Sequence, residues 1–141
     1  MNVSSITLLL CLLSLVLIGC NEKNTRDIKV SGSIIDSLSG QPIESANVTL
    51  LCWYDAGWEK TDYEIQDIVT DSNGLYEARF EEGYKVIVAS VAPEHKKAMH
   101  IVNNLNYSKI VVNLKLRHDS TSKRSSGINL EDYILSDTRS W

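Results

Sequence analysis

The chain has 141 residues, of which 43% are hydrophobic and 23% are charged, and its formal net charge is −4. This length is enough for one domain with a core of its own, because a domain of this size buries roughly two thirds of the surface that its unfolded chain exposes. The acidic balance argues against a nucleic-acid partner, since phosphate binding needs a basic surface.

The first feature in chain order is an apolar run from Ile6 to Ile18, 13 residues that are broken only by Thr7, Cys11 and Ser14. The run is too short to cross a bilayer, which takes about 20 residues, but it fits the apolar segment of a secretory signal peptide. A buried core helix is the alternative. We expect residues 1–19 to be a signal peptide that is removed.

The run ends in Leu17-Ile18-Gly19-Cys20. These residues resemble the bacterial lipobox, in which a branched apolar residue and a small residue precede a cysteine that receives lipid. The resemblance implies cleavage before Cys20, lipidation of its thiol, and a membrane anchor at that residue. Residues 20–26 would then form a short polar tether. Met1 to Thr7 contains no Lys or Arg, which departs from the usual basic start of a signal peptide.

From Asp27 onward, apolar residues recur at every second position, which is the period of a β-strand and not of a helix. Short strands with this spacing are typical of an all-β sandwich. Tyr84 to Ala92 is apolar on both faces, which indicates a central strand. The pattern predicts seven strands, over residues 28–34, 46–53, 64–70, 75–80, 84–92, 97–102 and 109–116.

Turn signals separate these strands. Asp36 to Pro42 is a turn cluster, and Asp71-Ser72-Asn73-Gly74 is the strongest signal, because Asp can start a type I turn and Gly can adopt positive φ. Residues 55–63 are predicted to be a polar loop that carries aromatic side chains. Residues 118–141 form a tail that begins with a linker-like composition; residues 130–135 could add a helical turn or an edge strand.

Two segments of the chain follow a pattern known from other proteins. The first comprises Val30 to Ile34, Asp36, Gly40 to Ile43 and Ala46 to Leu50, and the second is Thr70 to Tyr76. Together they resemble carboxypeptidase regulatory-like domains, and the resemblance covers residues 27–117. It implies a seven-stranded Greek-key sandwich like that of transthyretin. Such domains are usually non-catalytic and occur beside peptidases, as extensions of outer-membrane receptors, or in surface lipoproteins.

Aromatic side chains are concentrated between Trp53 and Tyr63, which holds two of the three tryptophans and two of the six tyrosines. Exposed rings near carboxylates can stack on a sugar or anchor a protein partner. We therefore single out Trp53, Trp58 and Tyr63 as candidate ligand-binding residues. The alternative is that Trp53 or Trp58 covers the open end of the sandwich.

The residues that could support catalysis or bind a metal do not form a recognisable motif. His95, His100 and His118 occur without an H-E-x-x-H pattern or paired cysteines, so we expect no metal site and no cofactor. Cys52 alternates with the inward-facing Leu50 and is expected in the core. We expect no enzymatic activity.

The sequence thus predicts a lipoprotein of the bacterial cell envelope, periplasmic or surface-exposed and anchored in the membrane at Cys20. Its β-sandwich would act as a non-catalytic binding or structural module, with an envelope protein or a glycan as partner. The main alternative is a glycan-binding accessory protein that uses the aromatic segment from Trp53 to Tyr63.

Overall fold

The computed structural model describes residues 23–58 and 60–120. The expected signal peptide, Cys20 and residues 121–141 of the expected tail lie outside the described residues. No described residue belongs to a helix long and apolar enough to span a membrane. The strands are β1 (Thr25–Asp36), β2 (Asn47–Gly57), β3 (Lys60–Val69), β4 (Leu75–Gly83), β5 (Lys85–Val91), β6 (Ala98–Val102), β7 (Lys109–Val111) and β8 (Leu114–Leu116).

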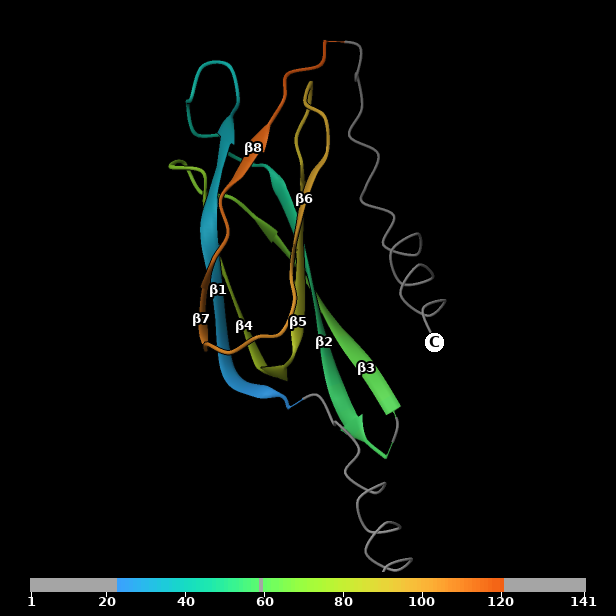
Figure 1. The fold of residues 1–141 in the computed structure, drawn as a ribbon. Coiled ribbons are helices and arrows are strands. Elements are labelled where there is room, and N and C mark those ends of the chain that lie inside the picture. The colour runs from blue at the N-terminus through green and yellow to red at the C-terminus, as the bar shows by residue number, and fades with distance from the viewer. Residues whose placement is uncertain (1–22, 59, 121–141) are drawn as a thin grey trace, which may run out of the picture.

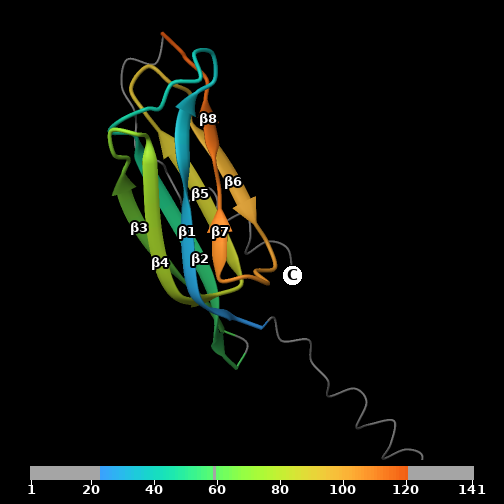
Figure 2. The same cartoon turned by 90° about the vertical axis from the view of Figure 1, so that its left-hand side faces the viewer.

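Two sheets pack face to face in these residues (Figure 1). One has the order β4-β1-β7, with β8 also paired to β1, and the other has the order β3-β2-β5-β6. Figure 2 shows the first sheet in front of the second. β1 pairs antiparallel with β4 and parallel with both β7 and β8. The prediction of an all-β sandwich is confirmed.

The last expected strand, residues 109–116, is divided into β7 and β8. Between them, the backbone N–H and the hydroxyl of Ser33 in β1 donate to the Asn113 side-chain oxygen, over 2.9 and 3.0 Å. A side chain therefore takes the place of a backbone acceptor at this point of the ladder. This interruption is why the described residues contain eight strands where seven were expected.

The prediction of a loop over residues 55–63 is wrong. β2 continues to Gly57 and β3 begins at Lys60, so the two strands form one hairpin with a register shift between Asp55 and Gly57. The side chains of β3 are mostly exposed. An edge strand of this kind pairs through its backbone and needs no apolar alternation, so the sequence pattern predicted its residues 64–69 but missed its start at Lys60.

The core lies between the two sheets and is built from the predicted inward-facing positions. β4 alternates between exposed and buried residues from Leu75 to Glu81, as expected for a strand with one face toward the core and the other toward solvent. Val86 to Val91 of β5 are all buried, which confirms the expected central strand. Cys52 is also buried, as predicted. The largest fully buried side chains include those of Ile28, Ile34, Leu50, Leu51, Leu116, Val30, Val48, Val86 and Val88.

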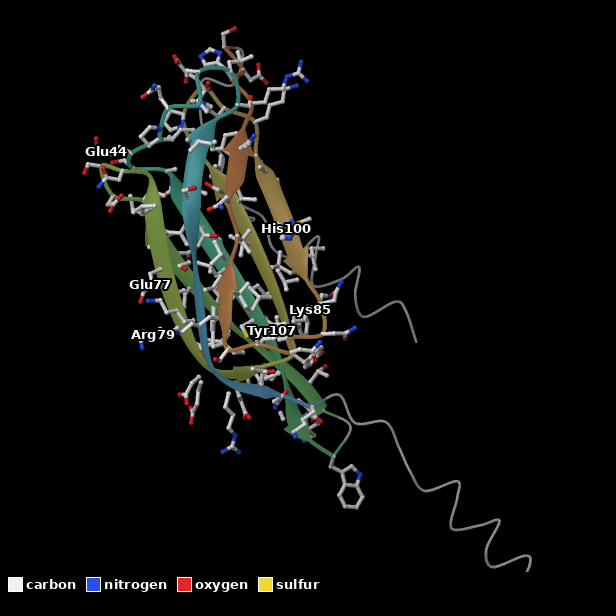
Figure 3. The ribbon with its side chains drawn as sticks, turned by 60° about the vertical axis from the view of Figure 1, so that its left-hand side comes forward. Glu44, Glu77, Arg79, Lys85, His100 and Tyr107 are labelled. Atoms are coloured by element: carbon white, nitrogen blue, oxygen red, sulfur yellow. The ribbon has the colours of Figure 1, made fainter. Side chains whose placement is uncertain are left out.

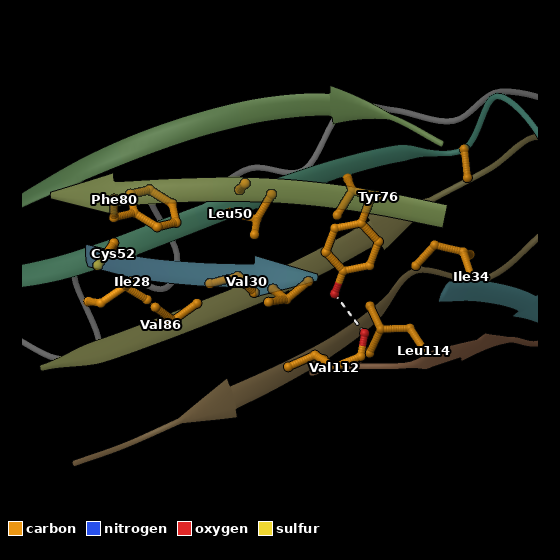
Figure 4. Close-up of a cluster of buried hydrophobic side chains, with 14 of the residues drawn as sticks. Ile28, Val30, Ile34, Leu50, Cys52, Tyr76, Phe80, Val86, Val112 and Leu114 are labelled. Carbon is orange, nitrogen blue, oxygen red and sulfur yellow. Dashed lines mark hydrogen bonds between the residues drawn. The ribbon is translucent and has the colours of Figure 1, made fainter. Parts of the chain in front are cut away.

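Gly32 in β1 lies against the segment that joins β7 to β8. A Cβ atom at this glycine would stand 1.7 Å from the carbonyl oxygen of Val112. The Tyr76 hydroxyl of β4 donates to the same oxygen over 2.7 Å, as Figure 4 shows. Burial raises the pKa of Tyr76, so its hydroxyl stays a donor. Three segments of the sheet thus meet at one carbonyl group.

Replacing Gly32 with alanine should destabilise the fold. The added methyl group would overlap the Val112 carbonyl, and overpacking of this kind costs about 1–3 kcal/mol in the free energy of unfolding. Urea unfolding of Gly32→Ala should show a lower midpoint than wild type. Ser31→Ala, at the neighbouring position of β1, serves as the matched control and should unfold near the wild-type midpoint. Equal midpoints for both variants would contradict the close approach.

The thiol of Cys52 should be unreactive in the folded protein. It donates to the Glu82 carbonyl over 3.6 Å, and burial, with a smaller effect from the Glu64 charge, raises its pKa to about 12. A negligible thiolate fraction and lack of access both suppress alkylation. Peptide mass spectrometry after iodoacetamide at pH 8 should find Cys52 unmodified in native protein and modified in guanidinium. Rapid labelling of native protein would place Cys52 outside the core.

Candidate functional site

The β2–β3 hairpin extends beyond the rest of its sheet. Along β2, pairing with β5 ends at Trp53, which lies opposite Lys85. The remaining residues of β2, 54–57, pair only with β3. The hairpin therefore projects past the body of the sandwich at the end where β1 begins (Figure 1).

Two of the three candidate aromatic residues lie together. Trp53 is 5% exposed and packs with Leu51 and Ile87 on the outer face of the β3-β2-β5-β6 sheet. The Tyr63 ring, whose residue is 38% exposed, lies with its centroid 5.1 Å from that of Trp53 at 58°. Trp53 therefore covers a sheet face and not the open end of the sandwich. Its buried indole Nε1 has no hydrogen-bond partner among the described residues.

Trp58 is placed differently, at the tip of the hairpin, and is 93% exposed. Its backbone has φ 42°, and the preceding Gly57 has φ 87°. The Gly57 N–H donates to the Asp55 carboxylate over 2.8 Å, which closes the turn. Positive φ is uncommon for a bulky residue and is found mostly where surrounding structure enforces it. The three rings thus do not form one exposed platform, because only Trp58 is fully accessible.

Asn24 attaches the start of the chain to this hairpin. Its side-chain amide donates to the Asp55 carbonyl and its side-chain oxygen accepts from the Asp55 N–H, both over 2.9 Å. An amide side chain that pairs with both backbone groups of one residue acts like a short strand beside β2. The sequence carried no signal for this contact, because the two residues are 31 positions apart.

A polar cluster occupies the opposite end of the sandwich, where β1 ends at Asp36. One oxygen of the Asp36 carboxylate accepts from the backbone N–H groups of Leu38 and Ser39, and the other lies 3.0 Å from His95 Nε2. His95 Nδ1 lies 2.7 Å from the Pro93 carbonyl. The backbone and hydroxyl donors of Ser39, with His95 and Leu38, hold the pKa of Asp36 well below its usual range. The cluster closes the turn after β1.

In the fold, His95 lies beside His118 and not beside His100, its nearest histidine in the sequence. The rings of His95 and His118 lie edge to face at 76° with centroids 5.5 Å apart, and His118 Nε2 is 3.8 Å from the Glu94 carboxylate. His100 lies on β6 opposite Val88 and is exposed (Figure 3). Within residues 23–58 and 60–120, no three His, Cys, Asp or Glu side chains form a group that could hold a metal ion.

The outer face of the β4-β1-β7 sheet bears a hollow of about 600 Å³ that polar and apolar residues line together, among them Ser31, Asn113, Leu75 and Val111. Glu77 and Arg79 project from β4 on this side (Figure 3), and Glu77 pairs with Lys29 over 2.8 Å. The Lys29 ammonium lowers the pKa of Glu77. Arg79 also lies 3.4 Å from Glu77, so these charged side chains bond to one another, while Leu75 and Val111 leave apolar surface exposed on the same sheet.

Comparison with known proteins identifies the fold but no family. No family model matches the chain, and no curated protein matches it. Catechol 1,2-dioxygenase from Acinetobacter radioresistens is 15% identical with a TM-score of 0.52, over 74% of this chain and 56% of that one. The group B streptococcus pilus 2b backbone protein is 8% identical with a TM-score of 0.51, over 69% and 43%. The chain spans little more than half of the dioxygenase and less than half of the pilus protein, and the likeness is one of β-sandwich fold alone.

The Asp36 cluster should make stability depend on acid pH. In the folded protein the pKa of Asp36 is held well below 3.8, so its carboxylate stays charged where the unfolded chain takes up a proton. This contribution to stability is present above pH 3.8 and is lost as the pH falls below it. Urea unfolding of Asp36→Asn should give a flatter dependence on pH in that acid window than wild type.

Ser39→Ala provides the graded control for this prediction, because it removes the hydroxyl donor and keeps the backbone donor of the same residue. Its profile should lie between those of wild type and Asp36→Asn. Parallel profiles for all three proteins would show that the carboxylate is not held by this turn.

Proposed function

We propose that this chain is a lipoprotein of the bacterial cell envelope, with residues 1–19 removed and Cys20 lipidated. Its β-sandwich, of the carboxypeptidase regulatory-like and transthyretin-like kind, serves as a non-catalytic binding or structural module. The expected tether of residues 20–26 is shorter than the sequence suggested, because β1 begins at Thr25, and the few residues after Cys20 connect the module to the membrane. The partner is an envelope protein that meets the exposed parts of the sandwich.

The observation that carries this proposal is the pairing of Asn24 with Asp55. Asn24 follows Cys20 by only four residues, and a stretch of that length reaches at most about 14 Å. A folded module that starts so close to a lipidated residue is held near the bilayer surface. This geometry favours a surface-bound scaffold or binding module over a freely diffusing one.

The sandwich topology supports the finer assignment. The first strand, β1, lies beside β4 on one side and runs parallel with the last strands, β7 and β8, on the other. The chain changes sheets four times, between β1 and β2, β3 and β4, β4 and β5, and β6 and β7. The expected turn at Asp71 is present, with Gly74 at φ 68° and two backbone N–H groups donating to the Asp71 carboxylate. The turn of the second signature segment therefore supports the resemblance on which the module is proposed.

Glycan binding through Trp53, Trp58 and Tyr63 has less support from the structure. Stacking on sugar needs an accessible ring face, and Trp53 is packed on the sheet beside Tyr63. Trp58 alone offers an open ring. The pilus backbone protein, which has a similar fold, supports the idea of a structural module at the level of the fold only.

Replacing Cys20 with alanine tests the anchor. Wild-type protein should incorporate radiolabelled palmitate and sediment with membranes, whereas Cys20→Ala should do neither, because the thiol that carries the lipid is gone. Cys11→Ala, which changes the other cysteine of the N-terminal region, is the matched control and should behave like wild type. Palmitate incorporation by Cys20→Ala, or wild-type protein without lipid, would refute the proposal.

A further inference from the structure

We propose that the tip of the β2–β3 hairpin enters the lipid–water interface of the membrane, with the Trp58 indole as the inserting group. This inference rests on the proposed lipid anchor at Cys20. It assigns the exposed tip to a lipid surface and not to a sugar or a protein, and it sets the orientation of the sandwich on the bilayer.

The Trp58 side chain is almost fully exposed to solvent. A side chain of this size that is 93% exposed leaves a large apolar area in water, and the backbone around it holds an unfavourable positive φ. Tryptophan is enriched at membrane interfaces, where its ring lies among the headgroups and its N–H meets water. A fully exposed indole at the end of a projecting hairpin suits that environment.

Only a short stretch of chain separates the hairpin stem from the proposed anchor at Cys20. Asn24 binds Asp55 in the hairpin stem, and Trp58 follows three residues later. Cys20 precedes Asn24 by four residues, which reach at most about 14 Å. Acyl chains on Cys20 would therefore bring the hairpin stem to the membrane surface.

The hairpin points away from the body of the sandwich. Residues 54–57 of β2 extend past the last residue that pairs with β5, and four strand residues span about 13 Å. The tip projects at the end where β1 starts, as Figure 1 shows. Approach of this end to a bilayer thus brings Trp58 into contact before the β5 side of the sheet.

A second exposed aromatic residue lies on a loop tied to the start of β1. Tyr107, 78% exposed, belongs to the loop between β6 and β7. The Thr25 hydroxyl donates to the Leu105 carbonyl, and the Lys29 N–H donates to the Ser108 carbonyl over 2.7 Å. Tyrosine shares the interfacial preference of tryptophan. Two aromatic side chains therefore flank the segment that follows the tether.

Charge around the tip does not select for acidic lipids. Asp55 and Asp62 offset Lys60 in the hairpin, so the tip has no basic cluster of the kind that binds anionic headgroups. Contact should depend on the indole and be similar in neutral and anionic vesicles. This independence separates the proposal from simple electrostatic adsorption.

Fluorescence in proteoliposomes tests the proposal. Full-length protein, processed in bacteria and shown by mass spectrometry to be acylated, is reconstituted into phosphatidylcholine vesicles with or without brominated acyl chains. Brominated lipid should quench part of the wild-type tryptophan emission, and Trp58→Phe should lose that lipid-dependent part. The Trp58 component should also shift to shorter wavelength on reconstitution.

Moving the indole provides the matched control. Leu38 is 82% exposed in the turn after β1, at the opposite end of the sandwich from the hairpin tip. The double variant Trp58→Phe with Leu38→Trp should be acylated and folded, and its added indole should escape quenching by brominated lipid. Quenching of the relocated indole to the same extent would overturn the proposed orientation.

The outcomes separate this inference from the proposed function. Acylated wild-type protein whose lipid-dependent quenching matches that of Trp58→Phe would overturn the membrane contact and leave the anchor intact. The tip would then be free for a protein or a sugar. Protein without acyl groups on Cys20 would refute the proposed function, and this inference would fail with it.

Discussion

The close approach of Gly32 to the Val112 carbonyl organises the sandwich. It lets the segment between β7 and β8 lie against β1, and the Tyr76 hydroxyl of β4 binds the same carbonyl oxygen. Because β1 is the inner strand of its sheet, both of its neighbours depend on this contact. The parallel addition of the last strands closes the sheet over Ile34 and Leu116, and burial of such side chains is the main source of stability.

With the sheets closed in this way, the two ends of the sandwich have different chemistry. The turn after β1 is held by Asp36, its backbone donors and His95, all polar groups. The end where β1 starts presents the projecting hairpin with Trp58, and Asn24 connects it to the residues that follow the tether. A sandwich with one polar end and one aromatic end beside its proposed anchor is suited to a defined orientation on a membrane.

The sequence predicted the strands whose side chains alternate between core and solvent, since burial on one face imposes a period of two on β1 and β4. It missed the first residues of β3, 60–63, because this exposed edge strand is held by backbone pairing. It identified the aromatic segment but expected Trp53, Trp58 and Tyr63 to act together. The stem pairing that buries Trp53 and the contact of Asn24 with Asp55 both depend on tertiary structure, which leaves no local pattern.

The proposed orientation on the membrane depends most directly on the contact between Asn24 and Asp55, which places the hairpin beside the tether. Nuclear magnetic resonance of the chain without its signal peptide and acyl groups measures it, through contacts between the Asn24 side-chain amide protons and the Asp55 amide proton. We expect a clear nuclear Overhauser effect between them and slow hydrogen exchange at Asp55. An Asn24 side chain with random-coil shifts and no contact to Asp55 would contradict the account, because the hairpin would then have no fixed relation to the anchor.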